Sequence, residues 1–527
     1  MFGFPIPLFA LYACLVLGLS GLALWLEPLW LWALGPFLLS LPVGLYDLYS
    51  RHNVLRNYPL VGHIRYLMEF IRPELRQYLF ESEQSGRPYN REQRTVIYER
   101  AYGLPDTSPF GTIRDVEAAG ADFAEHSLAV KTPPASAGRH RIGGEQCAKP
   151  YDASRLNISA MSFGSLSSNA VLAMNKGAHM GGFAHNTGEG GISEYHLAHG
   201  ADLIWEIGTG YFGCRTREGR FDGGAFEAKA AGDTVRMIEL KLSQGAKPSH
   251  GGVLPANKVT EEIARVREID PWTTCVSPPA HPEFDTPAGL LEFVARLRDL
   301  SGGKPTGFKL CLGRKSEFMA ICKAMRETGI RPDFITVDGA EGGTGAAPVE
   351  FSDSLGTYIN EGINFVHNAL VGAGLRDDIR LLASGKVAMG FDMLVKCALG
   401  ADGCNAARPF MFAVGCIQSR RCHTGTCPTG VATQSPQRMR ALDVQGKAIR
   451  VHNYHRLTLQ SFLDLTGALG IAHPDELTPD LIYHRPEFGP ARTYAELYPA
   501  TPPGGLLDGD APDEALRHWR QASADRF

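Results

Sequence analysis

Three cysteines stand close together late in the sequence and could hold a metal. Cys416, Cys422 and Cys427 follow a Cys-x5-Cys-x4-Cys spacing, and a proline comes directly after the last of them. Such a compact group of thiols suits one soft-metal site better than disulfides. Three thiolates match an iron–sulfur cluster with a missing corner. The spacing leaves two alternatives open: zinc with His423 as a fourth ligand, or scattered structural cysteines.

Two other stretches contain small residues that suit the binding of a phosphate group. They are Ser384-Gly385-Lys386 and the segment from Gly403 to Arg408. Small side chains let backbone N–H groups reach phosphate oxygens at the start of a helix. If both stretches follow the last strands of a (β/α)8 barrel, they lie where such barrels commonly hold a phosphate. Two ordinary turns are the alternative interpretation.

The elements that would position these residues begin near residue 155, where short β-forming runs alternate with helical stretches. This alternation favours parallel strands joined by crossover helices. The runs are 156–163, 183–187, 203–207, 237–242, 274–277, 307–312, 334–337, 379–383 and 403–407. They number nine, one more than a closed (β/α)8 barrel needs. Run 274–277 lies in a long Gly- and Pro-rich excursion, so we expect it outside the barrel.

The composition is that of a folded protein that does not bind nucleic acid. The 527 residues are 44% hydrophobic and 20% charged, with a net charge of −4. This balance creates no field that attracts nucleic acid, and no basic run with interleaved aromatic residues is present. The eleven cysteines show no paired spacings, which indicates a reducing compartment. We therefore expect no nucleic-acid partner.

Two apolar runs occupy the first 49 residues. Residues 1–26 carry no charged side chain, and a second run covers 29–46. Each is long enough to cross about 30 Å of hydrocarbon as a helix. A signal peptide would need a basic start and a clear cleavage site, and a buried core helix is the other alternative. Arginines follow the second run, whereas the turn between the runs carries only Glu27. The positive-inside rule then predicts a two-span hairpin in the inner membrane, with both chain ends in the cytoplasm.

The remaining chain divides into three further predicted parts. Residues 50–150 are polar and mixed, with a helix expected at 64–82, and we interpret them as a packing layer over the main domain and the membrane surface. Residues 151–435 form the predicted barrel domain with the cysteine loop 416–427. Residues 436–527 contain Pro-rich pieces and are expected to form a helical and irregular extension.

Taken in order, the stretches that end the predicted strands resemble the FMN-binding synthase domain of glutamate synthases. They are 158–167, Asn186-Thr-Gly-Glu-Gly-Gly191, 244–248, 277–281, 308–310 and 338–348. The cysteine stretch is similar, nearly residue for residue, to the [3Fe-4S] loop of the same family. The resemblance covers roughly residues 155 to 435. It implies a (β/α)8 barrel with FMN and a [3Fe-4S] cluster as cofactors.

The resemblance also implies roles for individual residues. Lys309 matches a lysine at the pyrimidine end of the flavin, where a cation stabilises negative charge on the reduced ring. Gln244 and Lys247 match residues near the carboxylates of 2-oxoglutarate, although a solvent-facing Lys247 remains an alternative. Two roles stay open for Glu189: orienting the substrate amine, or coupling to a partner. The other implied cofactor-binding residues are Ser159, Ala160, Met161, Ser162, Gly342, Gly343, Thr344, Ser384, Gly385, Lys386, Ala406, Ala407 and Arg408, and the implied cluster ligands are Cys416, Cys422 and Cys427.

The sequence departs from the family pattern at two sites. Family members usually read Lys-Pro-Gly-Glu-Gly-Gly where this chain reads Lys-Pro-Ser-His-Gly-Gly at 247–252. The segment 205–213 also differs, and it contains a Gly-x-Gly-x-x-Gly pattern. That pattern is not a dinucleotide fingerprint, because no apolar helix follows it.

The implied reaction is the reductive amination of 2-oxoglutarate through 2-iminoglutarate. Electrons from a ferredoxin or a reductase subunit would pass through the cluster to FMN and reach the imine as a hydride. Nothing here matches the family's amino-terminal glutaminase domain, so we expect ammonia, a small amine or a separate glutaminase subunit as the nitrogen source. The alternatives are a membrane-bound electron-transfer or scaffold subunit, and another FMN-barrel amine or 2-hydroxy acid oxidoreductase, for example one resembling N-methylglutamate synthase.

Overall fold

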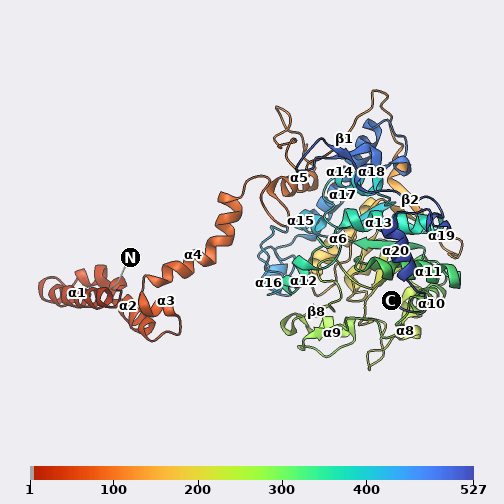
Figure 1. The fold of residues 1–527 in the computed structure, drawn as a ribbon. Coiled ribbons are helices and arrows are strands. Elements are labelled where there is room, and N and C mark those ends of the chain that lie inside the picture. The colour runs from red at the N-terminus through yellow and green to blue at the C-terminus, as the bar shows by residue number, and fades with distance from the viewer. Residues whose placement is uncertain (1–4) are drawn as a thin grey trace. The chain divides into compact units, whose positions relative to one another are not determined.

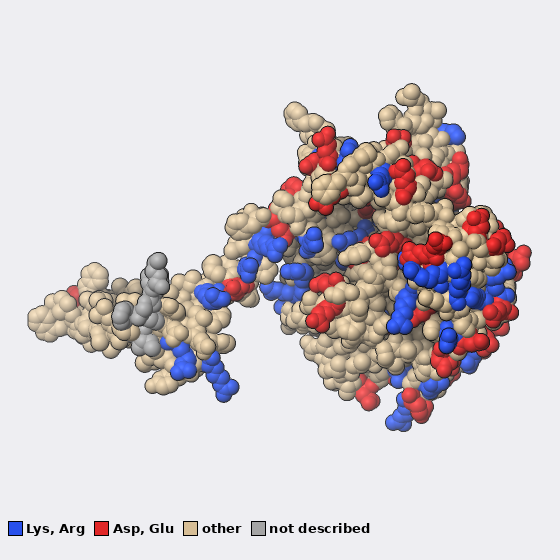
Figure 2. Space-filling model, viewed as in Figure 1, with Lys and Arg blue, Asp and Glu red and all other residues tan. Residues whose placement is uncertain are grey.

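The computed structural model describes residues 5–527 and contains two compact units, Met1–Arg91 and Glu92–Phe527. In the first unit, α1 (Pro5–Leu26) and α2 (Trp30–Leu48) correspond to the two apolar runs, except that residues 1–4 lie outside the described part. Both helices are long and apolar enough to cross a membrane, and most of each apolar stretch is exposed. Figure 2 shows few charged side chains over these helices. Length and composition therefore allow two spans.

The first unit continues in shorter helices after α2. They are α3 (Asn53–Asn57), α4 (Gly62–Leu75) and the π-helical turn η1 (Arg76–Phe80). The helix expected at 64–82 is therefore present as α4 and η1. Asp47, at the end of α2, accepts hydrogen bonds from the Leu60 backbone and the His63 ring, both at 2.9 Å. These bonds fix the start of α4 relative to the end of α2.

Eight parallel strands close into a barrel in the second unit (Figure 1). They are β4 (Leu156–Ile158), β5 (His185–Asn186), β6 (Leu203–Ile207), β7 (Val235–Lys241), β10 (Thr306–Leu310), β11 (Phe334–Asp338), β12 (Arg380–Ser384) and β13 (Gly403–Ala406), and β13 pairs with β4. The ninth predicted run is β9 (Cys275–Val276), which pairs with β8 (Val253–Leu254) outside the barrel. This confirms both the barrel and the position expected for the extra strand.

Helices cover the outside of the barrel. The longer ones are α6 (Ser168–Gly181), α8 (Gly223–Ala230), α10 (Pro287–Leu300), α11 (Lys315–Thr328), α13 (Ile359–Gly372), α14 (Gly390–Ala398) and α20 (Asp513–Gln521). Shorter helices are α7 (Glu194–Leu197), α9 (Glu261–Arg267), α12 (Val349–Ser354), α15 (Arg408–Val414), α16 (Pro436–Met439), α18 (Tyr494–Leu497) and α19 (Gly505–Asp508). Several begin at a side-chain cap: Thr286 accepts from the Gly289 N–H at the start of α10.

The barrel interior changes from apolar to polar along its axis. At the amino-terminal ends of the strands, the hairpin of β2 (Arg139–Ile142) and β3 (Tyr151–Ser154) contributes to one buried apolar cluster. That cluster consists of Ile142, Tyr151, Ala153, Ala184, Ile204, Met237, Phe334 and Leu382. Two residues further along the same strand faces come polar side chains, namely Glu206, Glu239, Thr336 and Ser384. The apolar layer supplies the core, and the polar layer faces the carboxyl ends.

The segments before and after the barrel pair with each other. β1 (Asp122–Ala124) joins β14 (Ile482–His484) and β15 (Arg492–Thr493) in a small antiparallel sheet. The long helix α17 (Val444–Ala468) packs against α6 and α14, and α5 (Arg91–Tyr102) contacts it through a hydrogen bond from Arg100 to Thr458. Residues 92–150 and 436–527 therefore form one layer on the barrel.

Candidate active site

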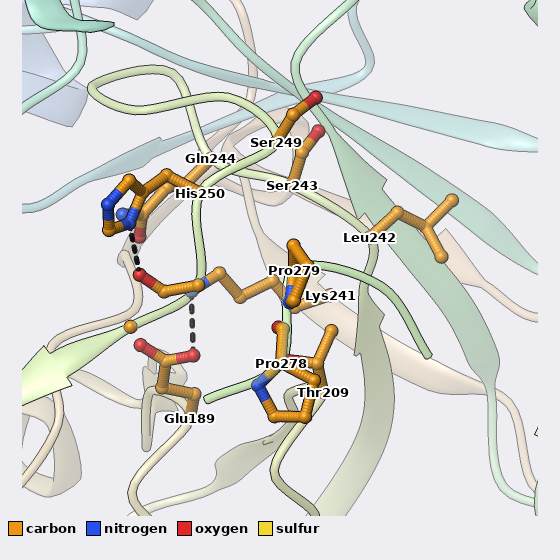
Figure 3. Close-up of a pocket in the computed structure, with 12 residues that line it drawn as sticks. Glu189, Thr209, Lys241, Leu242, Ser243, Gln244, Ser249, His250, Pro278 and Pro279 are labelled. Atoms are coloured by element: carbon orange, nitrogen blue, oxygen red, sulfur yellow. Dashed lines mark hydrogen bonds and ion pairs between the residues drawn. The ribbon is translucent and has the colours of Figure 1, made fainter. Parts of the chain in front are cut away.

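A pocket opens at the carboxyl end of β7, between the loops that follow β5, β6 and β7 (Figure 3). Its lining residues are Glu189, Thr209, Lys241, Leu242, Ser243, Gln244, Ser249, His250, Gly251, Gly252, Pro278 and Pro279. Glu189 and Lys241 form an ion pair at 2.9 Å, with side chains only 18% and 9% exposed. A Cβ atom at Gly252 would lie 2.4 Å from a Glu189 carboxylate oxygen. The glycine thus lets the loop approach the carboxylate closely.

Glu189 is ionised in this pocket. Burial opposes ionisation, but Lys241, assisted by Arg267 and Lys247, lowers the pKa of Glu189 to about 2. The pocket therefore holds a carboxylate and an ammonium group side by side. Lys241 was not among the predicted site residues, although its place at the end of a barrel strand was a signal for it.

The two predicted substrate residues lie on the loop that follows β7. Gln244 lines the pocket, and its side-chain Nε2 is buried without a hydrogen-bond partner among residues 5–527. Lys247 is 3% exposed and donates a 2.7 Å hydrogen bond to the backbone oxygen of Ala346. Burial lowers the pKa of Lys247. Lys247 is therefore buried against the loop after β11, and only Gln244 of the two reaches the pocket wall.

Below the pocket, the polar layer holds a network of buried charges. Lys309 donates to Glu206 at 2.6 Å, and Glu239 accepts hydrogen bonds from Asn186 at 2.7 Å and from Thr336 at 2.6 Å. Burial disfavours the Lys309 cation, but Glu206 and Glu239 outweigh this effect and raise its pKa. Burial, opposed by Lys309 and reinforced by Glu206, raises the pKa of Glu239 to about 7. Sequence reasoning singled out Lys309 but missed both glutamates.

The predicted phosphate-side residues come together at the ends of β4, β12 and β13. The Ser159 N–H donates to the Ala406 oxygen at 2.9 Å, and the Ser159 and Ser384 hydroxyls are 3.3 Å apart. Arg408 donates to the Glu341 oxygen at 2.6 Å, which brings the loop after β11 beside them. Gly385 and Lys386 have φ angles of +148° and +47°.

Gly343 lets the Arg408 side chain pack directly against the loop after β11. A Cβ at Gly343 would lie 2.7 Å from the Arg408 Nε atom. The side-chain oxygen of Asn405, on β13, is buried without a partner in the described chain.

The remaining predicted flavin-side residues lie on the loops after β11, β13 and β4. Gly342 donates to the Gly339 oxygen at 2.8 Å, whereas Thr344 is exposed. Ala407 caps α15. Of the first-strand loop, Met161 is buried, Ala160 is half-buried, and Ser162 bonds Ser165 and Arg267.

The cysteine loop follows α15 directly. The thiols of Cys422 and Cys427 act electrostatically on Cys416, so the three lie near one another. Burial raises the pKa of Cys416 to about 12. For Cys427 burial acts in the same direction, but the Thr429 hydroxyl and the backbone N–H groups of residues 429, 431 and 432 lower its pKa. His423 is exposed, and residues 5–527 contain no group of three His, Cys, Asp or Glu side chains placed to hold one metal ion.

A closed (β/α)8 barrel with a buried polar site at the carboxyl ends of its strands has the design of a barrel enzyme. The chain belongs to the glutamate synthase family, whose members are oxidoreductases acting on CH–NH2 donors. A family model described as the conserved region in glutamate synthase matches residues 129–472.

Individual relatives agree with this assignment. The glutamate synthase large subunit-like protein YerD of Bacillus subtilis (strain 168) is 39% identical over 84% of this chain and 91% of its own length. The archaeal glutamate synthase [NADPH] of Methanocaldococcus jannaschii is 34% identical over 60% of this chain and 58% of its own length. The chain spans only 20% of the glutamate synthase [NADPH] large chain of Bacillus subtilis, at 31% identity.

Proposed function

We propose that this chain reductively aminates 2-oxoglutarate with FMN in the barrel and a [3Fe-4S] cluster on the loop 416–427. The observation that carries the proposal is the pocket of Figure 3, in which an ammonium group, an ionised carboxylate and an unpartnered amide meet in a chain of the glutamate synthase family. The barrel would work at the cytoplasmic face of the inner membrane, anchored through α1 and α2.

The pocket suits a dicarboxylate substrate with an amino nitrogen. The Gln244 Nε2 atom needs an acceptor, and a carboxylate oxygen of 2-oxoglutarate would satisfy it. Lys241 supplies a positive charge at the same wall. The ionised Glu189 accepts hydrogen bonds, so it would orient the N–H groups of the incoming amine. These three side chains would bind and align the oxo acid and the amine at one place.

The opposite corner of the barrel mouth suits FMN. Ser159, Ser384 and Ala406 come within hydrogen-bond distance, and the glycine at 343 lets the Arg408 guanidinium group lie directly against the loop after β11. The unpartnered Asn405 oxygen needs a donor, which a flavin ring can offer. When bound, FMN supplies the hydride for the imine carbon and the cluster supplies single electrons. Lys309, held in place by Glu206, would contribute positive charge beneath the ring.

The cysteine loop suits a cluster better than a single zinc ion. A tetrahedral zinc site would take His423 as its fourth ligand, but His423 is exposed. A three-iron cluster needs only the three thiolates. The N–H groups that face Cys427 are the donors that stabilise cluster thiolates. The electron donor would be a ferredoxin or a reductase subunit.

Free ammonia or a small amine is the proposed nitrogen donor, supplied directly or by a glutaminase subunit. The described cysteines before the barrel are Cys14 in α1 and Cys147. Burial and Asp333 raise the pKa of Cys147 to about 11, so it is a poor nucleophile for glutamine hydrolysis. Supplying the purified chain with reductant, 2-oxoglutarate and either glutamine or ammonium tests this point. Equal glutamate formation from both, without contaminating glutaminase, would contradict it.

The overall proposal is tested with the purified full chain in detergent. We expect one FMN per chain in an acid extract, and iron and sulfide in the ratio of a three-iron cluster. Reduced flavin should reoxidise anaerobically on addition of 2-oxoglutarate with ammonium. An electron-transfer subunit would carry the cofactors without this reoxidation, and a 2-hydroxy acid or amine oxidase would instead be reduced by its own substrate. A chain without flavin would refute the proposal entirely.

A further inference from the structure

Lys258 connects the loop that begins at the flavin side with the cysteine loop. It ends the single turn η3 (Ala256–Lys258) in the excursion after β7, and its side chain is buried, with the residue 4% exposed. Its ammonium group donates to the backbone oxygens of Ser165 and Cys422, both at 3.2 Å. Ser165 bonds the hydroxyl of Ser162, a predicted flavin-side residue, at 2.9 Å. One lysine therefore touches both loops.

The charge of Lys258 has no carboxylate to balance it. None of the ion pairs described within residues 5–527 includes this lysine, and both of its bonds go to neutral carbonyl groups. Besides burial, the titratable groups that act on it are the thiols of Cys422 and Cys427 and the guanidinium group of Arg267. Lysine is almost never buried without a partner. A negatively charged group bound by the cysteine loop would supply the counter-charge that Lys258 needs.

We infer that Lys258 is a positioning residue that balances the negative charge of the cluster and raises its reduction potential. This inference rests on the proposed cluster. A three-iron cluster with three thiolates is anionic, and accepting one electron makes it more negative by one unit. A fixed cation beside it stabilises the reduced form more than the oxidised form, and burial strengthens this effect because water does not screen it. The electron comes from the external donor, and no bond forms or breaks at Lys258.

Gln434 offers a matched control. Its side chain donates to the backbone oxygens of Gly164 at 3.0 Å and Leu166 at 2.9 Å, on either side of Ser165. Gln434 thus holds the same loop without a charge. Replacing it disturbs the position of the loop, whereas replacing Lys258 removes a charge as well. A comparison of the two separates electrostatics from packing.

The experiment is a redox titration of the cluster by electron paramagnetic resonance, with iron content measured on each variant. We expect Lys258→Met to lower the reduction potential by at least 59 mV, a tenfold change in a one-electron equilibrium. Lys258→Arg and Gln434→Leu should stay close to wild type. Equal potentials for Lys258→Met and wild type, at equal iron content, would overturn the inference.

Loss of the cluster from Lys258→Met is also informative. If Lys258→Arg then keeps its iron, a cation is needed at this position and the inference stands. If the arginine variant loses iron as well, the shape of the lysine matters and its charge does not, which would overturn the inference. If the wild-type chain contains no iron, the proposed cluster itself is wrong. This outcome is distinguishable from failure of the Lys258 inference, because it is measured on the wild-type chain alone.

Discussion

The buried ion pair between Lys309 and Glu206 allows a quantitative prediction. The two groups are 2.6 Å apart, with side chains 5% and 2% exposed. Lys309→Met removes the cation and leaves Glu206 and the neighbouring Glu239 without a counter-charge. Glu206 can escape by taking up a proton, which costs an ordinary glutamate about 4 kcal/mol at neutral pH. We therefore expect a loss of about 3–5 kcal/mol in the free energy of unfolding, the range for breaking a buried pair.

The assay is urea unfolding of the full chain in detergent, followed by circular dichroism. If proton uptake sets the cost, the loss should shrink by about 1.4 kcal/mol for each pH unit below neutral. The double variant Glu206→Gln with Lys309→Met should recover most of the stability, because the glutamine carries no charge and Glu239 keeps its proton once Lys309, the charged group that lowers the pKa of Glu239, is gone. A single variant within about 1 kcal/mol of wild type, or a loss that does not depend on pH, would refute this reasoning.

Three further changes test the site. Gln244→Leu should raise KM for 2-oxoglutarate more than it alters the photoreduced flavin spectrum, because the buried Nε2 donor is lost and a hydrogen bond to a charged group contributes about 1.5–3 kcal/mol; unchanged kinetics would remove Gln244 from the site. Cys422→Ser should lose iron and keep flavin, and full iron content would show that the ligand assignment is wrong. Burial holds the pKa of Glu239 at about 7, above its ordinary value of 4.5. Its protonated form stabilises the fold at low pH, and this stability is lost as pH rises to about 7. Glu239→Gln should remove that fall between about pH 5 and about pH 7, and an identical pH profile for both proteins would contradict it.

Local patterns in the sequence were sufficient for the architecture and the motifs. The alternation of β runs with helical stretches predicted the barrel, and the Gly- and Pro-rich surroundings of 274–277 placed that strand outside it. Strand type and helix type follow from periodicities of a few residues, which a sequence displays directly. The cysteine spacing and the small residues at 384–386 are local in the same sense. Glu206 stands two positions after Ile204, so the two share one face of their strand. This spacing was a signal for a polar layer above the apolar one.

Only the tertiary structure decided which of these residues meet. Lys309 pairs with Glu206, 103 positions away, and Lys258 reaches Cys422 across 164 positions. Such contacts depend on the register of the strands around the closed barrel and on the path of the excursion after β7. Neither leaves a periodic trace in the chain, because each is the combined result of packing many elements. The sequence by itself therefore determined the fold class and the candidate chemistry, whereas the charge partners of Lys309, Lys241 and Lys258 follow from the closed barrel and its loops.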